Sequence, residues 1–251
     1  MKIAIISDIH GNMQALESIL NDIKSQNCDR IFCLGDLAMA GPEPDKTINK
    51  IKELLTEKNF ELIQGNTDQY LGENNIQIGE NIKKANIIMG NAYLSDIKEI
   101  SSINIDFLKN LPPQKEIIIG NIKILLVHGS PRANNENIFP SMAIEKIEEM
   151  IANTEADLIF CGHTHQPCGY QTNTKQTVVN VGSVGRPLSE IPKACYALLE
   201  ITNKETKEFN ISHVLVDYNK ELAAEILTKR KFEGSDKLAK MIICASERYP
   251  S

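Results

Sequence analysis

Short apolar runs that each end in a glycine beside a polar side chain are the feature that most constrains this fold. Such runs are Ile3–Ile6, Ile31–Leu34, Phe60–Ile63, Ile122–Val127 and Leu158–Cys161. Between the first three runs lie segments with apolar residues at helical spacing, such as Leu16, Ile19 and Ile23. Strands that alternate with helices predict right-handed crossovers into a parallel sheet. The first half is therefore predicted to be α/β, with Asn12 capping its first helix and Asp45 its second.

The second half of the chain predicts a sheet with fewer parallel strands. Gly120-Asn121 separates two apolar runs and is a two-residue hairpin signal. The runs 196–201 and 208–216, joined by a polar turn, predict a second hairpin. Between the hairpins, Ser141 is predicted to cap a helix that carries Ile144 and Ile147 on its apolar face.

Length and local composition suggest one main domain with two additions. The 251 residues correspond to one large domain, or to one domain with a small extension. We expect the main domain at 1–217, with a mainly helical insertion at about 70–113. The remainder, 218–251, is predicted to be a helical extension packed on the same domain, in which Lys229-Arg230-Lys231 forms a solvated helix face.

Charge and cysteine usage exclude several classes of protein. A net charge of −6 argues against a binder of nucleic acid polymers. The longest N-terminal apolar run is too short for an export signal or a membrane span, so we expect a cytoplasmic protein without a membrane partner. The six cysteines show no CxxC spacing, which favours reduced thiols. Neither a Walker loop nor a Rossmann glycine pattern is present. The sequence leaves the oligomeric state open.

Seven side chains with nitrogen or oxygen ligand atoms follow the predicted strands. They are Asp8, His10, Asp36, Asn66, His128, His163 and His165. In open α/β sheets, ligands bind outside the carboxyl ends of the strands. Imidazole together with carboxylate suits Mn, Fe, Zn or Ni rather than calcium. Seven ligands exceed one tetrahedral site and suit two ions that share a carboxylate.

Each motif has an ordinary structural interpretation when it is taken alone. Asp8-x-His10 can be a turn followed by a helix cap, and Gly35-Asp36 is common in turns. His128 can be a hydrogen-bonded core histidine. Gly162-His163-Thr164-His165 is stronger, because two neutral histidines are costly to bury without partners. The ordered combination of these motifs at strand ends therefore favours a metal site.

The order of these motifs resembles that of the calcineurin-like metallophosphoesterases. The resemblance covers about residues 1–217 and includes Gly65-Asn66-x-Asp68. Ser7–Asn12, His128–Pro131 and Asn180–Gly185 resemble a bacterial and archaeal phosphodiesterase-like branch of that family. The resemblance implies an α/β fold, a four-layer α/β/β/α sandwich of two mixed sheets.

The resemblance also implies a dinuclear hydrolase of small phosphate esters, a phosphodiesterase or phosphatase. Asp8, His10 and His165 would bind one divalent ion, and Asn66, His128 and His163 the other. Asp36 would bridge the ions. Manganese is expected first, with iron, zinc or nickel as alternatives. A metal-bridging hydroxide would be the nucleophile, and Asn66 and His128 are the expected catalytic residues.

Four further positions have both a functional and a structural interpretation. Asn12 is expected to orient phosphate, or simply to cap a helix. Arg186 is expected to clamp phosphate, or to be a surface arginine. Thr67 stands where many relatives carry a histidine that protonates the leaving group. Asp68 is either a substitute acid or, more in keeping with its position, the N-cap of the following helix.

Three other functions are compatible with the resemblance. A dinucleoside polyphosphate hydrolase remains open, and a protein Ser/Thr phosphatase is disfavoured because Thr67 replaces the histidine. A non-catalytic scaffold is the alternative of a different class, because a fold does not fix a function. The presence of all seven ligand residues argues against the scaffold.

Overall fold

The computed structural model describes residues 1–188 and 191–245, which contain two five-stranded sheets. The first sheet has the order β10 (Glu208–Val216), β9 (Ala194–Asn203), β1 (Lys2–Ile6), β2 (Arg30–Cys33) and β3 (Phe60–Leu62). Strands β1, β2 and β3 are parallel, whereas β9 pairs antiparallel with β1 and with β10. The predicted parallel first half and the second hairpin are thereby confirmed.

The second sheet combines a parallel centre with antiparallel edges. Its order is β4 (Lys115–Ile119), β5 (Ile122–Leu126), β6 (Leu158–Cys161), β8 (Thr177–Asn180) and β7 (Cys168–Gln171). Strands β5, β6 and β8 run parallel, and β4 and β7 are antiparallel to their neighbours. Gly120, with φ +58°, turns the first hairpin as predicted. The edge strand β7 was not predicted, because its half-exposed sequence carries no apolar run.

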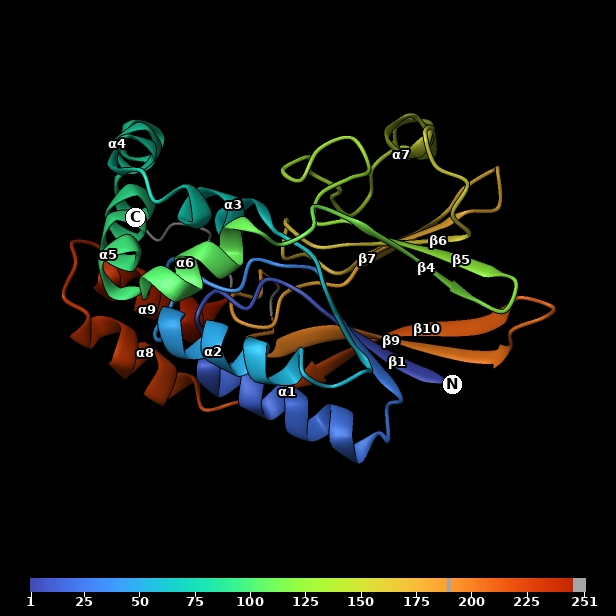
Figure 1. Cartoon of the computed structure of the whole chain (residues 1–251), viewed down its shortest axis with the longest axis horizontal. Helices are drawn as coiled ribbons and strands as arrows, with labels where there is room; N and C mark the ends of the chain where they lie inside the picture. Colours follow the sequence, from blue (N-terminus) through green and yellow to red (C-terminus); the bar gives the residue numbers. More distant parts are fainter. Residues whose placement is uncertain (189–190, 246–251) are drawn as a thin grey trace.

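Helices cover the outer faces of both sheets (Figure 1). Helices α1 (Met13–Ser25) and α2 (Pro44–Leu54) lie on the first sheet, and α7 (Ile144–Ile151) lies on the second. The other helices gather at one end of the sheets: α3 (Asn66–Glu73), α4 (Ile76–Ala85), α5 (Ile87–Glu99), α6 (Ser102–Lys109), α8 (Lys220–Lys229) and α9 (Ser235–Cys244). The segment 70–113 contains the end of α3 and the whole of α4, α5 and α6.

Strands β1 and β6 are almost wholly apolar because both of their faces are buried. In β1, Ile3 and Ile5 pack into the layer between the two sheets, whereas Ala4 and Ile6 pack beneath the helices. The two-residue period of a strand places successive side chains on opposite faces. In the same way, β5 and β6 send Leu126 and Phe160 into the central layer. This packing confirms the predicted four-layer α/β/β/α sandwich of two mixed sheets.

The C-terminal helices share the outer core of the first sheet. Leu227 of α8 and Leu238 of α9 belong to the same buried cluster as Leu16 of α1 and Tyr93 of α5. The predicted extension is thus packed on the main body as far as residue 245, while 246–251 lie outside the described residues. Within the described residues the structure contains no helix long and apolar enough to span a bilayer.

Three local predictions were wrong. Asp45 does not cap α2, because Pro44 occupies the first turn and the Asp45 carboxylate instead accepts from Ser101 N at 2.8 Å. Ser141 does not cap α7, which begins at Ile144 with no side-chain cap. Arg230 is not solvated: only 6% of its side chain is exposed, and it forms an ion pair with Asp96.

Candidate metal centre

The seven predicted ligand residues come together where the two sheets present their carboxyl ends. Asp8 follows β1, Asp36 follows β2 and Asn66 begins α3 after β3. The second sheet contributes His128 after β5 and the His163–His165 segment after β6. Asp8, Asp36 and His128 are buried. The site therefore lies across both sheets.

Three of the histidines are fixed in one tautomer by backbone carbonyls. The Nδ1 atoms of His10, His128 and His165 lie 3.0 Å from Met39 O, 2.7 Å from Leu34 O and 2.7 Å from Arg186 O. Because a carbonyl oxygen only accepts, each Nδ1 carries the hydrogen and donates it. In the uncharged ring each Nε2 then presents a lone pair to the centre, and carbonyls orient metal-binding histidines in the same way in the outer shell of many metal sites.

The geometry of His10 and His165 fits a cation. Their Nε2 atoms lie 3.0 Å apart. When both rings are uncharged, neither Nε2 carries a hydrogen, and the two lone pairs face each other and repel. A divalent ion that accepts both lone pairs removes this repulsion, and imidazole nitrogen is a preferred ligand of transition metals.

The two aspartates each hold one oxygen on the backbone and direct the other inward. Asp8 Oδ2 accepts from His163 N at 3.0 Å, and Asp36 Oδ1 accepts from Thr67 N at 2.9 Å. The inner oxygen, Asp8 Oδ1, is buried and has no hydrogen-bond partner among the described residues. It lies 3.2 Å from His165 Nε2. A buried, unpaired carboxylate oxygen is costly, and a metal ion would satisfy it.

Two overlapping groups of ligand atoms result. Asp8, His10 and His165 form one, and Asp8, Asp36 and His128 form the other, with all ligand atoms of a group within 4.8 Å of one another. Asp36 Oδ2 lies 3.6 Å from His10 Nε2 and 3.3 Å from His128 Nε2, so it reaches both groups. The membership of Asp8 in both groups was not predicted.

Asn66 and His163 stand beside the second group. Asn66 Oδ1 lies 3.1 Å from His128 Nε2. The ring of His163 is 5.5 Å from that of His128, measured between centroids, and belongs to neither group within the described chain. The structure therefore brings all seven residues to one centre, with the His163 ring at its margin.

Burial and charge give these groups the protonation states that metal binding requires. Burial and the neighbouring His165 lower the pKa of His10 to about 3, and burial lowers that of His163 to about 4. Burial raises the pKa of Asp8, but His165 and His128 outweigh it and lower that pKa to about 2. For Asp36 the pKa is likewise lowered, because His128 outweighs burial. Metal ligands bind in these deprotonated forms.

His128 differs from the other histidines. Burial disfavours its charged form, yet the carboxylates of Asp36 and Asp8 raise its pKa to about 10. A proton on Nε2 neutralises part of the negative charge that the two aspartates bring together. A metal ion would replace that proton, so we expect metal binding to release it.

The backbone is strained at five of the predicted ligands. Asp8, His10, Asp36, His163 and His165 all have φ between 48° and 67°. For residues other than glycine this left-handed conformation costs roughly 1–2 kcal/mol. Strained backbone of this kind collects at functional sites, where the surrounding structure holds it.

Asp68 supports the loop rather than facing the centre. It is the third residue of α3 and not its N-cap, which is Gly65, so the predicted position is wrong, but its Oδ2 accepts from Gly65 N at 2.9 Å and thereby caps the same helix. Its Oδ2 accepts from Asp36 N at 2.7 Å and its Oδ1 from Leu37 N at 2.9 Å. Burial and the Asp36 charge raise its pKa to about 7. Both oxygens are thus committed to the backbone that carries Asp36.

A cavity of about 110 Å³ opens onto the centre. It is lined by His10, Asp36, Asn66, Thr67, Met89, His163, His165, Arg186 and Leu188. The predicted residue Arg186 is among them, and its Nη1 lies 3.8 Å from Met89 Sδ. Met89 and Leu188 were missed, because apolar residues of an insertion and a loop carry no chemical signal.

Asn12 is not among the residues that line the cavity. Its Oδ1 accepts from Ala15 N at 3.1 Å, which confirms the predicted cap of α1. Its Nδ2 donates to Gly185 O at 2.9 Å. Both polar ends of the buried side chain are therefore used within the fold.

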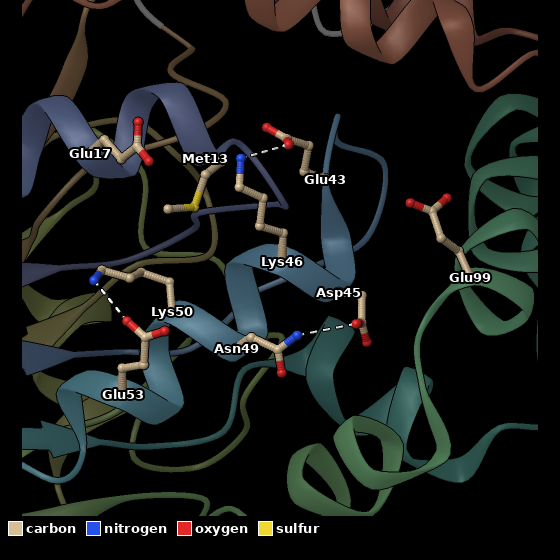
Figure 2. Close-up of a pocket in the computed structure, with 9 residues that line it drawn as sticks. All are labelled: Met13, Glu17, Glu43, Asp45, Lys46, Asn49, Lys50, Glu53 and Glu99. Carbon is tan, nitrogen blue, oxygen red and sulfur yellow. Dashed lines mark hydrogen bonds and ion pairs between the residues drawn. The ribbon is translucent and has the colours of Figure 1, made fainter.

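A larger surface hollow lies beside α1 and α2 (Figure 2). Its volume is about 550 Å³, and its charged residues largely pair with one another. Lys46 lies 2.9 Å from Glu43, and Lys50 lies 2.8 Å from Glu53. The hollow contains none of the predicted ligands. The chemistry of the chain therefore points to the smaller cavity.

Comparison with known proteins agrees with this geometry. Residues 1–204 match the calcineurin-like phosphoesterase superfamily domain. An uncharacterized protein of Methanocaldococcus jannaschii is 32% identical over 246 residues, which cover 91% of this chain and 93% of that protein.

Two solved structures share the fold. A hypothetical protein from Pyrococcus horikoshii has a TM-score of 0.82 at 23% identity, with 95% of this chain and 97% of the other covered. A metallophosphoesterase from Sphaerobacter thermophilus has a TM-score of 0.76 at 23% identity, with 98% and 100% covered. With the family match over most of its length and the ligand groups described above, this chain belongs to the calcineurin-like phosphoesterase superfamily.

Proposed function

We propose that this protein is a metal-dependent hydrolase of small phosphate esters, acting on diesters or on monoesters with good leaving groups. The observation that carries the proposal is the pair of ligand groups that share Asp8 and are both reached by Asp36. Superfamily membership supports the same reaction class. We expect Asp8, His10 and His165 to hold one ion, Asn66, His128 and His163 the other, and Asp36 to bridge them.

Two bound divalent ions would supply positive charge that attracts the phosphate group. They would also lower the pKa of a bound water toward neutrality. Manganese is the first candidate, followed by iron, zinc and nickel, because the donor set combines imidazole with carboxylate.

The chain itself supplies orientation and charge. With Asn66 Oδ1 turned toward His128, the Asn66 amide hydrogens are left to donate to a phosphate oxygen. The Arg186 side chain lines the same cavity, and we expect its guanidinium group to bind the anionic group of the substrate. The apolar side chains of Met89 and Leu188 line the same cavity, and we expect them to limit the access of water to its polar atoms.

We expect protonation of the leaving group to be the inefficient step of the reaction. Thr67 lines the cavity where an acid would act, and its hydroxyl donates to Ala38 O at 3.1 Å. A hydroxyl does not serve as a general acid near neutral pH as an imidazole does. Asp68 does not line the cavity and its oxygens are held by backbone amides. We therefore expect activated aryl esters to react faster than alkyl esters.

Metal titration and hydrolysis of bis-(p-nitrophenyl) phosphate test the proposal on the full chain. We expect two Mn²⁺ per chain by calorimetry, activity that depends on Mn²⁺, and loss of activity after chelation. Asp36→Asn should reduce turnover at least 100-fold, because it removes the negative charge that reaches both ligand groups. Glu155→Gln is the matched control, since this carboxylate is 91% exposed and far from the site in the fold.

Two outcomes would contradict the proposal. Stoichiometric metal without turnover on any ester would favour the non-catalytic scaffold. Failure to bind divalent metal would remove the basis of both interpretations. Turnover confined to dinucleoside polyphosphates in a substrate panel would assign the narrower alternative.

A further inference from the structure

A buried ion pair joins the insertion to the C-terminal helices. Asp96 of α5 is fully buried, and Arg230, at the end of α8, has 6% of its side chain exposed. Arg230 Nη2 lies 2.6 Å from Asp96 Oδ1. The two residues are 134 positions apart in the chain, and neither lines the cavity of the metal centre. A buried pair of this kind is weak evidence for stability alone, so a different role is worth seeking.

Both partners of this pair bind the same short loop. Asp96 Oδ2 accepts from Ala40 N at 2.9 Å, and Arg230 Nη1 donates to Gly41 O at 2.7 Å. The pair therefore holds two consecutive residues of the 39–41 loop, Ala40 through its N–H and Gly41 through its carbonyl.

The loop has a conformation that requires such support. Met39 has φ +82° and Ala40 has φ +64°, both in the left-handed region. Two consecutive residues of this kind, neither of them glycine, persist only where other contacts hold them.

The same loop orients the metal ligand His10. Met39 O accepts the hydrogen of His10 Nδ1 at 3.0 Å, which fixes the ring tautomer and the direction of Nε2. A Cβ atom at Gly41 would lie 1.5 Å from the carbonyl oxygen of His10, so the loop also packs directly on the His10 backbone.

From these contacts we infer that Asp96 and Arg230 are positioning residues for His10. They clamp the 39–41 loop, and the loop holds the imidazole toward Asp8 and His165. This inference rests on the proposed function, because it assigns the clamp to one of its two metal positions. It also gives the insertion and the C-terminal extension a common purpose.

The clamp acts selectively on one metal position. His128 Nδ1 donates to the carbonyl oxygen of Leu34, which follows β2, and His165 Nδ1 donates to that of Arg186. Neither carbonyl belongs to the 39–41 loop. A loosened loop should therefore weaken the ligand group that contains His10 and leave the group around His128 nearly unchanged.

Stepwise Mn²⁺ binding to the full chain tests the inference, with the wild type compared with a single and a double variant. Asp96→Asn keeps an oxygen for Ala40 N but loses the charge, and the double variant Asp96→Ala with Arg230→Met removes both charges together. We expect the affinity of one Mn²⁺ position to fall about 10–100-fold in the double variant, as for other outer-shell substitutions. The other position should stay within twofold, and Asp96→Asn should have a smaller effect.

Glu99→Gln is the control, because Glu99 contacts Arg230 Nε at 2.9 Å from a half-exposed position and does not touch the loop. A ring-nitrogen NMR spectrum gives a readout that does not depend on metal. The hydrogen on His10 Nδ1 should be protected from exchange in the wild type and in Glu99→Gln, and should exchange at least tenfold faster in the double variant.

Equal losses at both metal positions, or a lower melting temperature with unchanged metal affinities and unchanged exchange, would overturn the inference. If the wild type bound no metal, the proposed function would fail, while the exchange of the His10 ring hydrogen would still decide whether the clamp exists.

Discussion

Five of the seven proposed ligand side chains use one atom for anchoring and present another to the site. His10 donates from Nδ1 to Met39 O and presents Nε2, while Asp8 accepts from His163 N on one oxygen and presents the other. Ligands held in this way lose little conformational entropy when a metal binds. The anchors are mostly backbone groups, so the precision of the site depends on the loops that supply them.

At this scale the most informative substitution is Thr67→His. It introduces an imidazole at the position where we propose that the leaving group departs. General acid catalysis contributes about 10²–10⁴-fold to a reaction rate. We expect turnover of an alkyl phosphate ester to rise at least tenfold, with a much smaller change for a p-nitrophenyl ester. Initial rates for a series of esters with different leaving groups measure this.

Thr67→Asn is the control, because it adds a polar side chain of intermediate size without an acid. The backbone N–H of residue 67, which donates to Asp36 Oδ1, is kept in both variants. Unchanged alkyl ester turnover in Thr67→His, with metal content intact, would show that protonation does not limit the rate.

At the scale of elements, the strand ends are packed so closely that glycine is required at some of them. Gly162 follows β6, and a Cβ atom there would lie 2.2 Å from Ser7 Oγ and 2.5 Å from Asp8 Oδ2. This close approach brings the end of one sheet against the end of the other. It also places the N–H of His163 on Asp8.

Gly162→Ala should therefore displace the Asp8 carboxylate. We expect Mn²⁺ affinity to fall at least tenfold and the free energy of unfolding to fall by about 1–3 kcal/mol, as in other overpacked sites. Calorimetry and urea denaturation measure the two effects. In the control Gly169→Ala, on β7, the atom nearest to the added Cβ would be Val178 O at 4.0 Å, so both quantities should stay near wild type. Similar losses in both variants would contradict the argument.

At the scale of the whole molecule, the layer between the two sheets keeps the halves of the metal centre in register. The first sheet carries Asp8, Asp36 and Asn66, and the second carries the histidines that follow β5 and β6. Phe160 of β6 is fully buried in this layer. Its packing therefore affects both stability and the distance between the two sets of ligands.

Phe160→Ala should lower the free energy of unfolding by about 3–5 kcal/mol, the usual cost of removing a buried phenylalanine. Ile118→Ala is the control, since Ile118 of β4 is 70% exposed and should change stability by less than about 0.5 kcal/mol. Urea denaturation monitored by circular dichroism gives both values. A loss below 1 kcal/mol for Phe160→Ala would mean that this layer repacks easily.

Without a structure, the sequence predicts every strand except β7 and the seven candidate ligand residues of the proposed centre, while the family resemblance implies the layers. Periodicity is local, and the Asp, Asn and His residues stand next to the apolar runs that become strands, so both signals are readable without contacts. The packing of the two sheets confirms the four-layer arrangement, and the family match confirms the superfamily. The predicted helix caps at Asp45 and Ser141 were wrong, because α2 already begins at Pro44 and α7 begins only at Ile144.

The contacts that surround the candidate ligand residues are visible only in the tertiary structure. The place of Asp8 in both ligand groups, the backbone anchoring by Asp68 and the burial of Arg230 against Asp96 depend on contacts between distant segments. Arg230 resembles a solvated residue in its local sequence, because its neighbours are both lysines. Its partner lies on another helix, and hydrogen bonds between distant segments leave no periodic trace in a sequence.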